Sequence, residues 1–153
     1  MKYRAAIATT CVDRDGVRFT RECLEQVQIG EEFEIFHECD YRIKVGMGRV
    51  AELDADGVLW VEGVVIDKYR GQIRTEPMFL VFNGVVDVVE EGGGLKVVHH
   101  IKRMGGGTTR NPADLTLPPL MPLDNETRQA KRCQMRKIRR LRNRILSQHK
   151  IEV

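Results

Sequence analysis

The chain contains a single serine in 153 residues, at position 147, close to the C-terminus. A serine hydrolase built on the main body is therefore excluded, unless the C-terminal segment folds back into it. The four cysteines, at positions 11, 23, 39 and 133, include no CxxC pair, so we expect free thiols in a reducing compartment. No run of about 18 apolar residues is present and no apolar stretch follows Met1. The sequence therefore predicts neither a membrane-spanning helix nor a signal peptide.

The net charge is small, at +3, but it hides an asymmetry along the chain. Residues 124–153 carry ten lysines or arginines and three acidic residues, a net charge of +7. Residues 1–123 carry fifteen basic and nineteen acidic residues, a net charge of −4. An acidic body with a strongly basic tail predicts two parts, a folded domain and an electrostatic arm.

Hydrophobic periodicity predicts a body made mostly of β-strands. One short amphipathic helix is expected over 20–28, with Thr20 as its N-cap and Gly30 at its end. The sequence DADG at 54–57 is a turn signal, whereas NG at 83–84 can be either a hairpin turn or a bulge. The expected strands, which alternate with a period of two or are apolar on both faces, cover 3–10, 32–36, 45–53, 58–66, 78–89 and 95–104.

The predicted fold class is mainly β (α+β): a small closed or partly open antiparallel β-barrel with one or two flanking helices, plus a C-terminal basic helix. We expect the barrel domain to cover 1–104. The Gly/Pro-rich segment 105–123 has little periodicity and is predicted to be a linker. A basic helical arm is expected over 124–153, with Asp124 or Asn125 as the helix cap.

His37 is the first candidate catalytic residue. It lies between acidic residues at the end of an apolar strand, in the sequence EIFHECD. Glu38 or Asp40 could orient the imidazole as a general base. The alternative interpretation is a surface histidine at a strand end.

His99 and His100 form a second candidate pair, on the strand expected over 95–104. Strict alternation places His99 on the same face as Leu95, Val97 and Ile101, so His99 is predicted to point inward and His100 to be solvated. A buried histidine is either a hydrogen-bonded core residue or a catalytic group, and the sequence leaves both interpretations open.

Metal binding and thiol catalysis are two further possibilities. A metal site would need His37 and Cys39 to converge with one or two of Cys11, Cys23 and His99, but the H-x-C spacing is not a structural zinc pattern. Cys39 or Cys11 paired with a histidine could act as a nucleophile, although most free cysteines are simply buried. We expect neither a metal nor a cofactor.

The basic arm is the strongest physical signal in the sequence. Nine cations lie within 17 residues of it, so they repel one another and predict an anionic partner. The arm contains no aromatic residue, which argues against base stacking on single strands. Ile138, Leu141 and Ile145 form an apolar stripe that favours docking onto protein; the alternative is a solvated helix. The candidate partner-binding or nucleic-acid-binding residues are Arg128, Lys131, Arg132, Arg136, Lys137, Arg139, Arg140, Arg142 and Arg144.

The order of these features resembles that of phage prohead (head maturation) proteases. The sequence DRDGVRFTRECLE at 13–25 is similar to the family's early turn and helix, and His37 stands where the family has its catalytic histidine before an acidic residue. The best single match is GRV at 48–50 followed by DGVLWVEG at 56–63, similar to the family's G-R-V and D-G-L-Y-V-E-G stretch.

The resemblance continues more thinly to about residue 114. Residues 81–89 and the glycine turn after them resemble the strand pair that carries and follows the nucleophile, and NPA at 111–113 resembles a late proline-alanine element. The fold it implies is the small β-barrel with flanking helices shared with herpesvirus assemblins. By order along the chain, His99 or His100 could match the second histidine of the assemblin-type site.

The sequence departs from the family at the nucleophile. The resemblance places a serine on the strand at about 79–82, where this chain has MFLVF at 78–82, without serine, cysteine or threonine. The helix that precedes that strand is reduced to 67–74. Thr75 is the nearest hydroxyl and would need a shift of about one turn or strand step. We therefore expect no catalytic residue, with His37, His99 and His100 as vestigial candidates.

The expected function is that of a non-catalytic, prohead-protease-like structural protein of a phage head, such as a minor capsid, cement or assembly component. Its partners would be the major capsid protein or other virion proteins, with packaged DNA contacted through the basic arm and no membrane involved. The expected location is the virion head, and the host cytoplasm during assembly. The alternatives are an active protease that uses Cys39 or Thr75, and a nucleic-acid-binding module unrelated to capsids.

Overall fold

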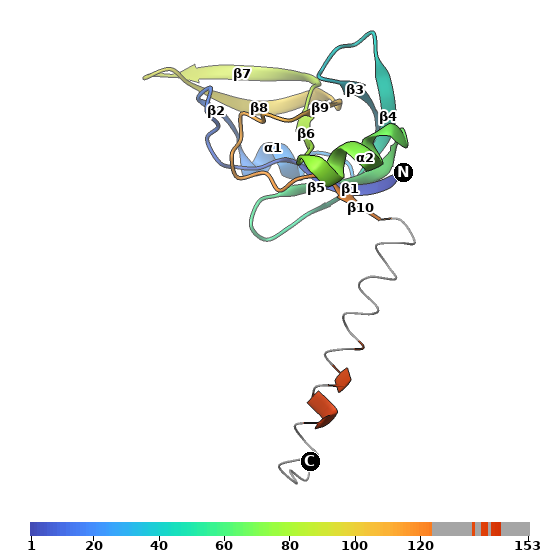
Figure 1. Ribbon diagram of the computed structural model, residues 1–153. Coiled ribbons are helices and arrows are strands. Elements are labelled where there is room, and N and C mark those ends of the chain that lie inside the picture. Colours follow the sequence, from blue (N-terminus) through green and yellow to red (C-terminus); the bar gives the residue numbers. More distant parts are fainter. Residues whose placement is uncertain (124–135, 137–138, 141, 145–153) are drawn as a thin grey trace. The chain divides into compact units, whose positions relative to one another are not determined.

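The computed structural model describes residues 1–123, 136, 139–140 and 142–144 (Figure 1). The chain divides into two compact units, Met1–Pro122 and Leu123–Val153, and each is considered by itself. Among the described residues, no helix is long and apolar enough to cross a membrane.

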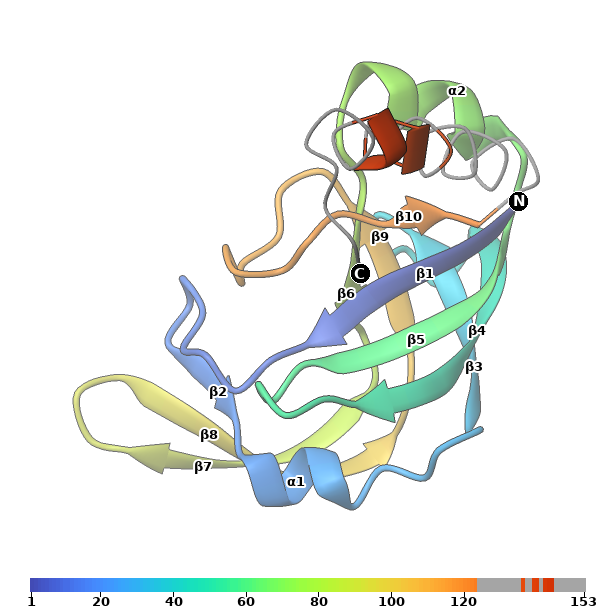
Figure 2. The same ribbon diagram turned by 90° about the horizontal axis from the view of Figure 1, so that it is seen from below.

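The first unit is mainly β, as predicted, and its larger sheet curls into a half-barrel (Figure 2). Neighbouring strands in this sheet run antiparallel, except that β3 and β9 are parallel. In order across the sheet, the seven strands are β10 (Met121–Pro122), β1 (Lys2–Ala8), β5 (Leu59–Val65), β4 (Lys44–Leu53), β3 (Glu32–His37), β9 (Gly106–Thr109) and β6 (Phe79–Phe82).

A smaller three-stranded sheet lies beside the half-barrel. Its order is β2 (Val17–Phe19), β8 (Leu95–Arg103) and β7 (Val85–Glu91). The strands β7 and β8 form an antiparallel hairpin, and β2 pairs in parallel with the other side of β8. In both views the closed end of the hairpin projects away from the seven-stranded sheet (Figures 1 and 2).

The core fills the inside of the curled sheet. Its largest fully buried side chains include Tyr3 and Ile7 of β1, Ile35 of β3, Leu59 of β5 and Leu80 of β6. Burial of one such aliphatic side chain contributes about 1.5–3 kcal/mol to folding. The strands predicted from alternation or from continuous apolar runs therefore supply the main stabilisation of this unit.

Two short helices, α1 (Arg21–Glu25) and α2 (Lys68–Thr75), accompany the sheets. The predicted N-cap of α1 is confirmed, because Thr20 Oγ1 accepts a hydrogen bond from Cys23 N at 3.0 Å. The helix buries Cys23 and Leu24. It is shorter than predicted, and its last residue is followed by a non-helical stretch that leads to Gly30 at φ +91°.

The predicted turn at 54–57 is confirmed and is organised by one carboxylate. Asp54 Oδ1 accepts the backbone N–H groups of Asp56 at 2.9 Å and Val58 at 3.0 Å. Asp54 Oδ2 accepts the indole N–H of Trp60 at 2.8 Å. These hydrogen bonds, that of Trp60 foremost, hold the pKa of Asp54 below its usual value.

We expect Asp54→Asn to lower the melting temperature at neutral pH, because the charged acceptor of three hydrogen bonds is lost. Because the pKa of Asp54 is lower in the folded protein than in the unfolded chain, where it is about 3.9, the ionised carboxylate stabilises the fold at neutral pH. This stabilisation is lost as the pH falls through the pKa of the folded protein. The difference in melting temperature between Asp54→Asn and the wild type should therefore shrink below about pH 4. Thermal unfolding monitored by circular dichroism between neutral and acidic pH measures this. Asp56→Asn, in the same turn, is the control, and an equal loss in both variants would contradict the assignment.

The prediction of a linker over 105–123 is wrong, because the first residues of this segment form β9, an inner strand of the larger sheet. This strand lies between β3 and β6, and Gly105 to Thr108 are buried. The glycines here are explained by close packing: a Cβ on Gly107 would overlap Cys39 Sγ, and one on Gly105 would overlap Asn83 O. Met121–Pro122 adds the edge strand β10, so the first unit extends past residue 104.

The single strand expected over 78–89 is also corrected. The structure divides it into β6 and β7, which belong to different sheets. Asn83 and Gly84 make the crossing, with Asn83 N donating to Gly105 O at 2.8 Å. Neither a two-residue hairpin nor a bulge is formed there, because the flanking strands do not pair with each other.

Of the second unit, the structure describes only Leu123 and six residues in the region of the predicted basic helix. Arg136, Arg139, Arg140, Arg142, Asn143 and Arg144 are helical and exposed. The other residues of the predicted arm lie outside the described part of the chain.

Candidate functional site

His37 stands at the C-terminal end of β3 and is held by a tyrosine of α2. Its Nδ1 lies 2.6 Å from Tyr69 Oη, and the two rings are stacked at 24° with centroids 5.9 Å apart. The His37 side chain is 33% exposed, whereas Tyr69 is fully buried. One ring nitrogen of His37 therefore faces the protein interior, and the other is left for solvent or a ligand.

Thr108 of β9 extends this contact into a hydrogen-bonded chain. Its position is in register with His37 across the parallel β3–β9 pair. Its Oγ1 lies 3.0 Å from Tyr69 Oη and accepts the backbone N–H of Glu38 at 3.3 Å. Thr108 is fully buried, so its hydroxyl hydrogen needs an acceptor within the protein.

The direction of this chain follows from counting hydrogens. If Tyr69 donated to Thr108, the Thr108 hydrogen would have no acceptor among the contacts observed for the described residues. Thr108 therefore donates to Tyr69 Oη, and the Tyr69 hydroxyl donates to His37 Nδ1. The neutral imidazole then carries its hydrogen on Nε2.

This arrangement is the reverse of what a histidine general base requires. In a hydrolytic triad the third group accepts a hydrogen bond from Nδ1–H, so that Nε2 presents a lone pair to the nucleophile. Here Nδ1 accepts, and Nε2–H is a donor. Burial raises the pKa of the Tyr69 phenol, which keeps that hydroxyl neutral and available as the donor.

Neither Glu38 nor Asp40, the two carboxylates considered as partners of His37, forms a hydrogen bond with its imidazole. Glu38 Oε1 is 3.8 Å from His37 Nε2, beyond the distance of a hydrogen bond. Asp40 forms a two-point contact with Arg42, at 3.0 and 2.9 Å, and these hydrogen bonds hold the pKa of Asp40 below its usual value. Neither carboxylate accepts a hydrogen from Nδ1.

The strand expected to carry the nucleophile, β6, is apolar and is separated from the strand of His37 by β9. Leu80 of β6 pairs with Thr108, which pairs in turn with His37. The three positions therefore form one row across the sheet. Leu80 is fully buried within the core, so the β6 position in this row carries an aliphatic side chain without a nucleophilic group.

The alternative nucleophiles do not complete a catalytic pair either. Thr75 ends α2, and its hydroxyl donates to Gln72 O at 3.0 Å. Cys39 is partly buried, and burial raises the pKa of its thiol. A thiol with a raised pKa stays protonated at neutral pH, which is the less reactive form. No contact between Cys39 or Thr75 and a histidine is observed among the described residues.

The turn after His37 has an unusual backbone. Asp40 N donates to His37 O at 2.9 Å, and the two central residues, Glu38 and Cys39, have φ of 49° and 59°. This is the conformation of a type I′ turn, which favours Asn-Gly. Side chains other than those of Asn, Asp and Gly carry a steric cost there.

We expect Glu38→Asn to raise the free energy of unfolding by up to about 1 kcal/mol, because asparagine tolerates the left-handed region better than glutamate. Urea denaturation of the full chain measures it. Glu32→Asn, at an exposed position in the extended strand β3 with no ion pair among the described residues, is the control and should not be stabilised. Destabilisation by Glu38→Asn would show that the Glu38 side chain contributes more than its backbone strain costs.

The prediction that His99 points inward is wrong, because a β-bulge interrupts the alternation. Asp87 pairs with His100 and Val88 with Val98, so His99 is the extra residue of β8. His99 and His100 are both exposed. His100 Nδ1 lies 3.4 Å from Asp87, which also pairs with Lys102 at 3.1 Å. Neither histidine contacts His37 in the described part of the chain.

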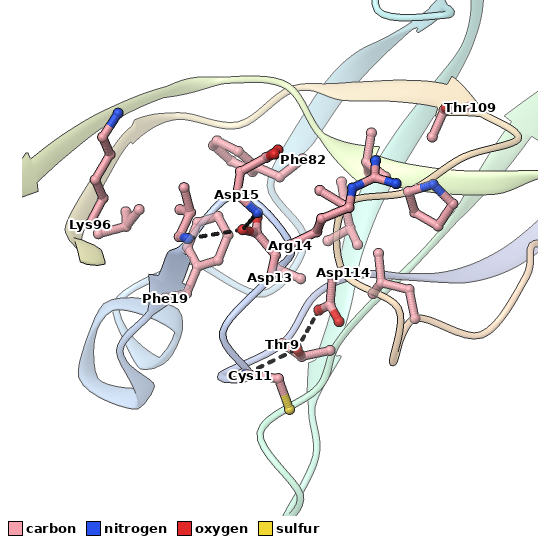
Figure 3. Close-up of a pocket in the computed structure, with 18 of the residues that line it drawn as sticks. Thr9, Cys11, Asp13, Arg14, Asp15, Phe19, Phe82, Lys96, Thr109 and Asp114 are labelled. Carbon is pink, nitrogen blue, oxygen red and sulfur yellow. Dashed lines mark hydrogen bonds between the residues drawn. The ribbon is translucent and has the colours of Figure 1, made fainter. Parts of the chain in front are cut away.

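A cavity of about 530 Å³ opens on the other side of β6, between the two sheets (Figure 3). Val81 and Phe82 of β6 line one wall, and Val86, Val88 and Val98 of the three-stranded sheet line another. The loop 109–114 closes a third side, tied to the turn at 13–16 by a hydrogen bond from Arg14 N to Ala113 O of 2.9 Å.

The cavity rim carries polar groups that are largely engaged within the protein. Asp114 Oδ2 accepts the Thr9 hydroxyl at 2.5 Å, and Asp13 Oδ1 accepts the N–H groups of Asp15 and Val17 at 2.9 Å each (Figure 3). Cys11 and Cys39 also line the cavity. Within the described residues, no group of three or more histidine, cysteine, aspartate or glutamate side chains is placed to hold a metal ion.

Only part of the predicted basic site can be located. Arg136, Arg139, Arg140, Arg142 and Arg144 are described as helical and exposed. Arg128, Lys131, Arg132 and Lys137 lie outside the described residues.

Comparison with known proteins found no match among protein-family models, curated proteins or solved structures.

Sequence reasoning missed Tyr69 and Thr108, the two residues that fix the orientation of His37. Tyr69 lies in a segment with a weak helical pattern, and Thr108 lies in the segment that was expected to be a linker. One signal was present: two β-branched residues, Thr108 and Thr109, follow three glycines, a composition that also suits a closely packed strand.

Proposed function

We propose that this chain is a non-catalytic, protease-like structural protein of a phage head, with a basic arm that binds an anionic partner. It would act as a minor capsid, cement or assembly component. Its location would be the virion head, and the host cytoplasm during assembly. The proposal is supported by the resemblance of residues 13–25, 48–50 and 56–63 to prohead proteases and by the mainly β body with a curled sheet.

The hydrogen-bonded chain from Thr108 through Tyr69 to His37 is the observation that carries the non-catalytic part of the proposal. It leaves the outward-facing nitrogen of His37 as a donor. The row that contains His37 also contains the buried Leu80 in place of a reacting hydroxyl. Acyl transfer needs both a nucleophile and a base with a free lone pair, and this chain offers neither at that place.

The charge of the arm supports the binding part. The segment 124–153 has a net charge of +7, against −4 for the rest of the chain, and its described arginines are exposed. The anionic partner would be packaged DNA or an acidic surface of the major capsid protein or another virion protein. Both partners would respond to salt, but only DNA binding would be abolished by nuclease treatment.

Quantitative mass spectrometry of purified phage particles that encode this chain tests the structural role. We expect the protein in the particles at a fixed number of copies relative to the major capsid protein. Its absence from particles, while it is present in infected cells, would contradict the proposal. A nucleic-acid-binding module unrelated to capsids, which the basic arm also favours, would then become the better interpretation.

A further inference from the structure

The strand β7 has one edge without a pairing partner. The order of the small sheet is β2–β8–β7, so β7 bonds to β8 on one side only. Among the described residues no other strand pairs with its second side. The free edge runs over seven residues, Val85 to Glu91, and an unpaired edge of this length is a template for strand addition.

The side chains on this edge are more apolar than a free surface strand requires. Val85, Val88 and Val89 are 41%, 43% and 51% exposed. Natural edge strands are commonly protected by charges, prolines or bulges. Both register irregularities of this hairpin lie in β8, at His99 and Lys102, so neither blocks the free side of β7.

The charges on β7 are acidic, and the one nearest the hairpin end, Glu91, has no basic residue opposite it in β8, where it pairs with Leu95. Asp87 is paired with Lys102 and contacts His100. Glu90 and Glu91 are exposed and form no ion pair within the described part of the chain. Lys96 lies opposite Glu90, so a strand laid along this edge would meet unpaired negative charge chiefly at Glu91 and valines nearer the middle.

The same strand borders the cavity between the sheets. Val86 and Val88 line that cavity, together with Val98 and Phe19. Val88 is both partly exposed and part of the lining. A strand added beside β7 would direct alternate side chains toward this face of the sheet, next to apolar surface.

We propose that the free edge of β7 binds an extended peptide segment of a partner protein, with an aliphatic residue opposite Val88 and a lysine or arginine near Glu90 and Glu91. The main-chain groups of β7 supply the hydrogen bonds, and the two glutamates select the basic residue. A second copy of β7 fits less well, because it would bring further acidic residues to the same edge. This site is independent of the function proposed above.

The first test uses three peptides of the same length and the full-length protein. The probe is the labelled peptide Lys-Val-Lys-Val-Lys-Val-Lys. A second peptide has N-methyl groups on its central valine and on the lysine after it, which keeps the charge and removes a ladder N–H in either register. The third has glutamate in place of each lysine. Fluorescence anisotropy should show binding of the first peptide only. Equal binding of the N-methylated peptide would overturn strand addition, because the ladder needs those N–H groups.

Hydrogen exchange provides the second readout. The peptide should slow exchange at backbone amides between Val85 and Glu91, since edge amides become hydrogen-bonded. Binding without new protection in this segment would contradict the proposal. If the free protein self-associates and the same backbone amides become protected, the occupant of the edge is a second copy of this chain. That result would also contradict the proposal.

Charge reversal tests the selection by the glutamates. Glu91→Lys alone, and Glu90→Lys with Glu91→Lys, should weaken binding of the lysine peptide, the double variant on the order of tenfold. The double variant should gain binding of the glutamate peptide. Glu32→Lys, an exposed position on β3 of the other sheet, is the matched control. An unchanged affinity in both β7 variants would overturn the assignment. If the double variant fails to fold, the single variant Glu91→Lys still provides the test.

Discussion

Replacing Arg136, Arg139, Arg140, Arg142 and Arg144 by glutamine is expected to weaken binding of the full-length chain to double-stranded DNA by roughly two to three orders of magnitude at low salt. These five arginines are exposed and helical, and they supply half of the ten basic residues of the arm. Each phosphate that an arginine no longer neutralises reduces the slope of log K against log salt by about 0.9, so the slope should fall by about 4 to 5. Fluorescence anisotropy at several salt concentrations measures both quantities.

Two further variants separate charge from other effects. Replacement of the same five arginines by lysine keeps the charge and should retain most of the affinity. Neutralising Lys2, Lys68 and Lys96, exposed residues of the body, should change it little. The role of the arm would be contradicted if the glutamine variant bound double-stranded DNA as tightly as the wild type. It would also be contradicted if the affinity for DNA did not depend on salt. Binding to polyglutamate but not to DNA would assign the arm to an acidic protein surface.

Leu80→Ser is expected to lower the free energy of unfolding by about 4 kcal/mol and to create no peptidase activity. Leu80 is fully buried in the core. Removal of a buried leucine side chain costs about 2–5 kcal/mol, and an unsatisfied buried hydroxyl adds about 1–3 kcal/mol. Small domains are stable by only about 5–15 kcal/mol, so the variant should unfold at a clearly lower urea concentration. Leu80→Met, with a similar volume, should cost less than about 1.5 kcal/mol.

The absence of activity in Leu80→Ser follows from the state of His37. A serine in the row of His37 and Thr108 would still face an imidazole whose outer nitrogen carries a hydrogen. Fluorogenic peptides and a capsid-protein substrate, assayed at a temperature where the variant is folded, test this expectation. Peptidase activity in Leu80→Ser that disappears in the double variant with His37→Ala would contradict it.

Local patterns were sufficient to predict five of the ten strands that the structure describes. Alternation or continuous apolar runs located β1, β3, β4, β5 and β8 within a few residues. The cap at Thr20 and the turn at Asp54 depend on side chains that bond to nearby backbone, so they too were visible in the sequence. These elements are determined by interactions between residues close together in the chain.

The elements that were mispredicted depend on distant contacts. β9 is rich in glycine because β3, β6 and Cys39 pack closely around it, and the sequence pattern of such a strand resembles that of a linker. The division between β6 and β7 at Asn83 results from pairing with two different sheets. Propensity and periodicity contain no information about either arrangement.

The candidate site was predictable only in its central residue. His37 was visible from the acidic residues around it, but its partners come from a helix and a strand 32 and 71 positions later in the chain. The orientation of His99 was mispredicted because strict alternation fails in β8, where His99 and Lys102 are extra residues without a partner in β7. Such bulges are set by the pairing of the two strands, not by the pattern of one.

The tautomer of His37 is the measurement that tests the non-catalytic account most directly. Long-range ¹H–¹⁵N correlation spectra of the full-length protein at a pH where the imidazole is neutral distinguish a hydrogen on Nε2 from one on Nδ1. The hydrogen-bonded chain from Thr108 and Tyr69 predicts the Nε2–H form, and Tyr69→Phe should shift the spectrum toward a mixture of tautomers. A wild-type protein in the Nδ1–H form would present a free lone pair at Nε2, and that result would contradict the account.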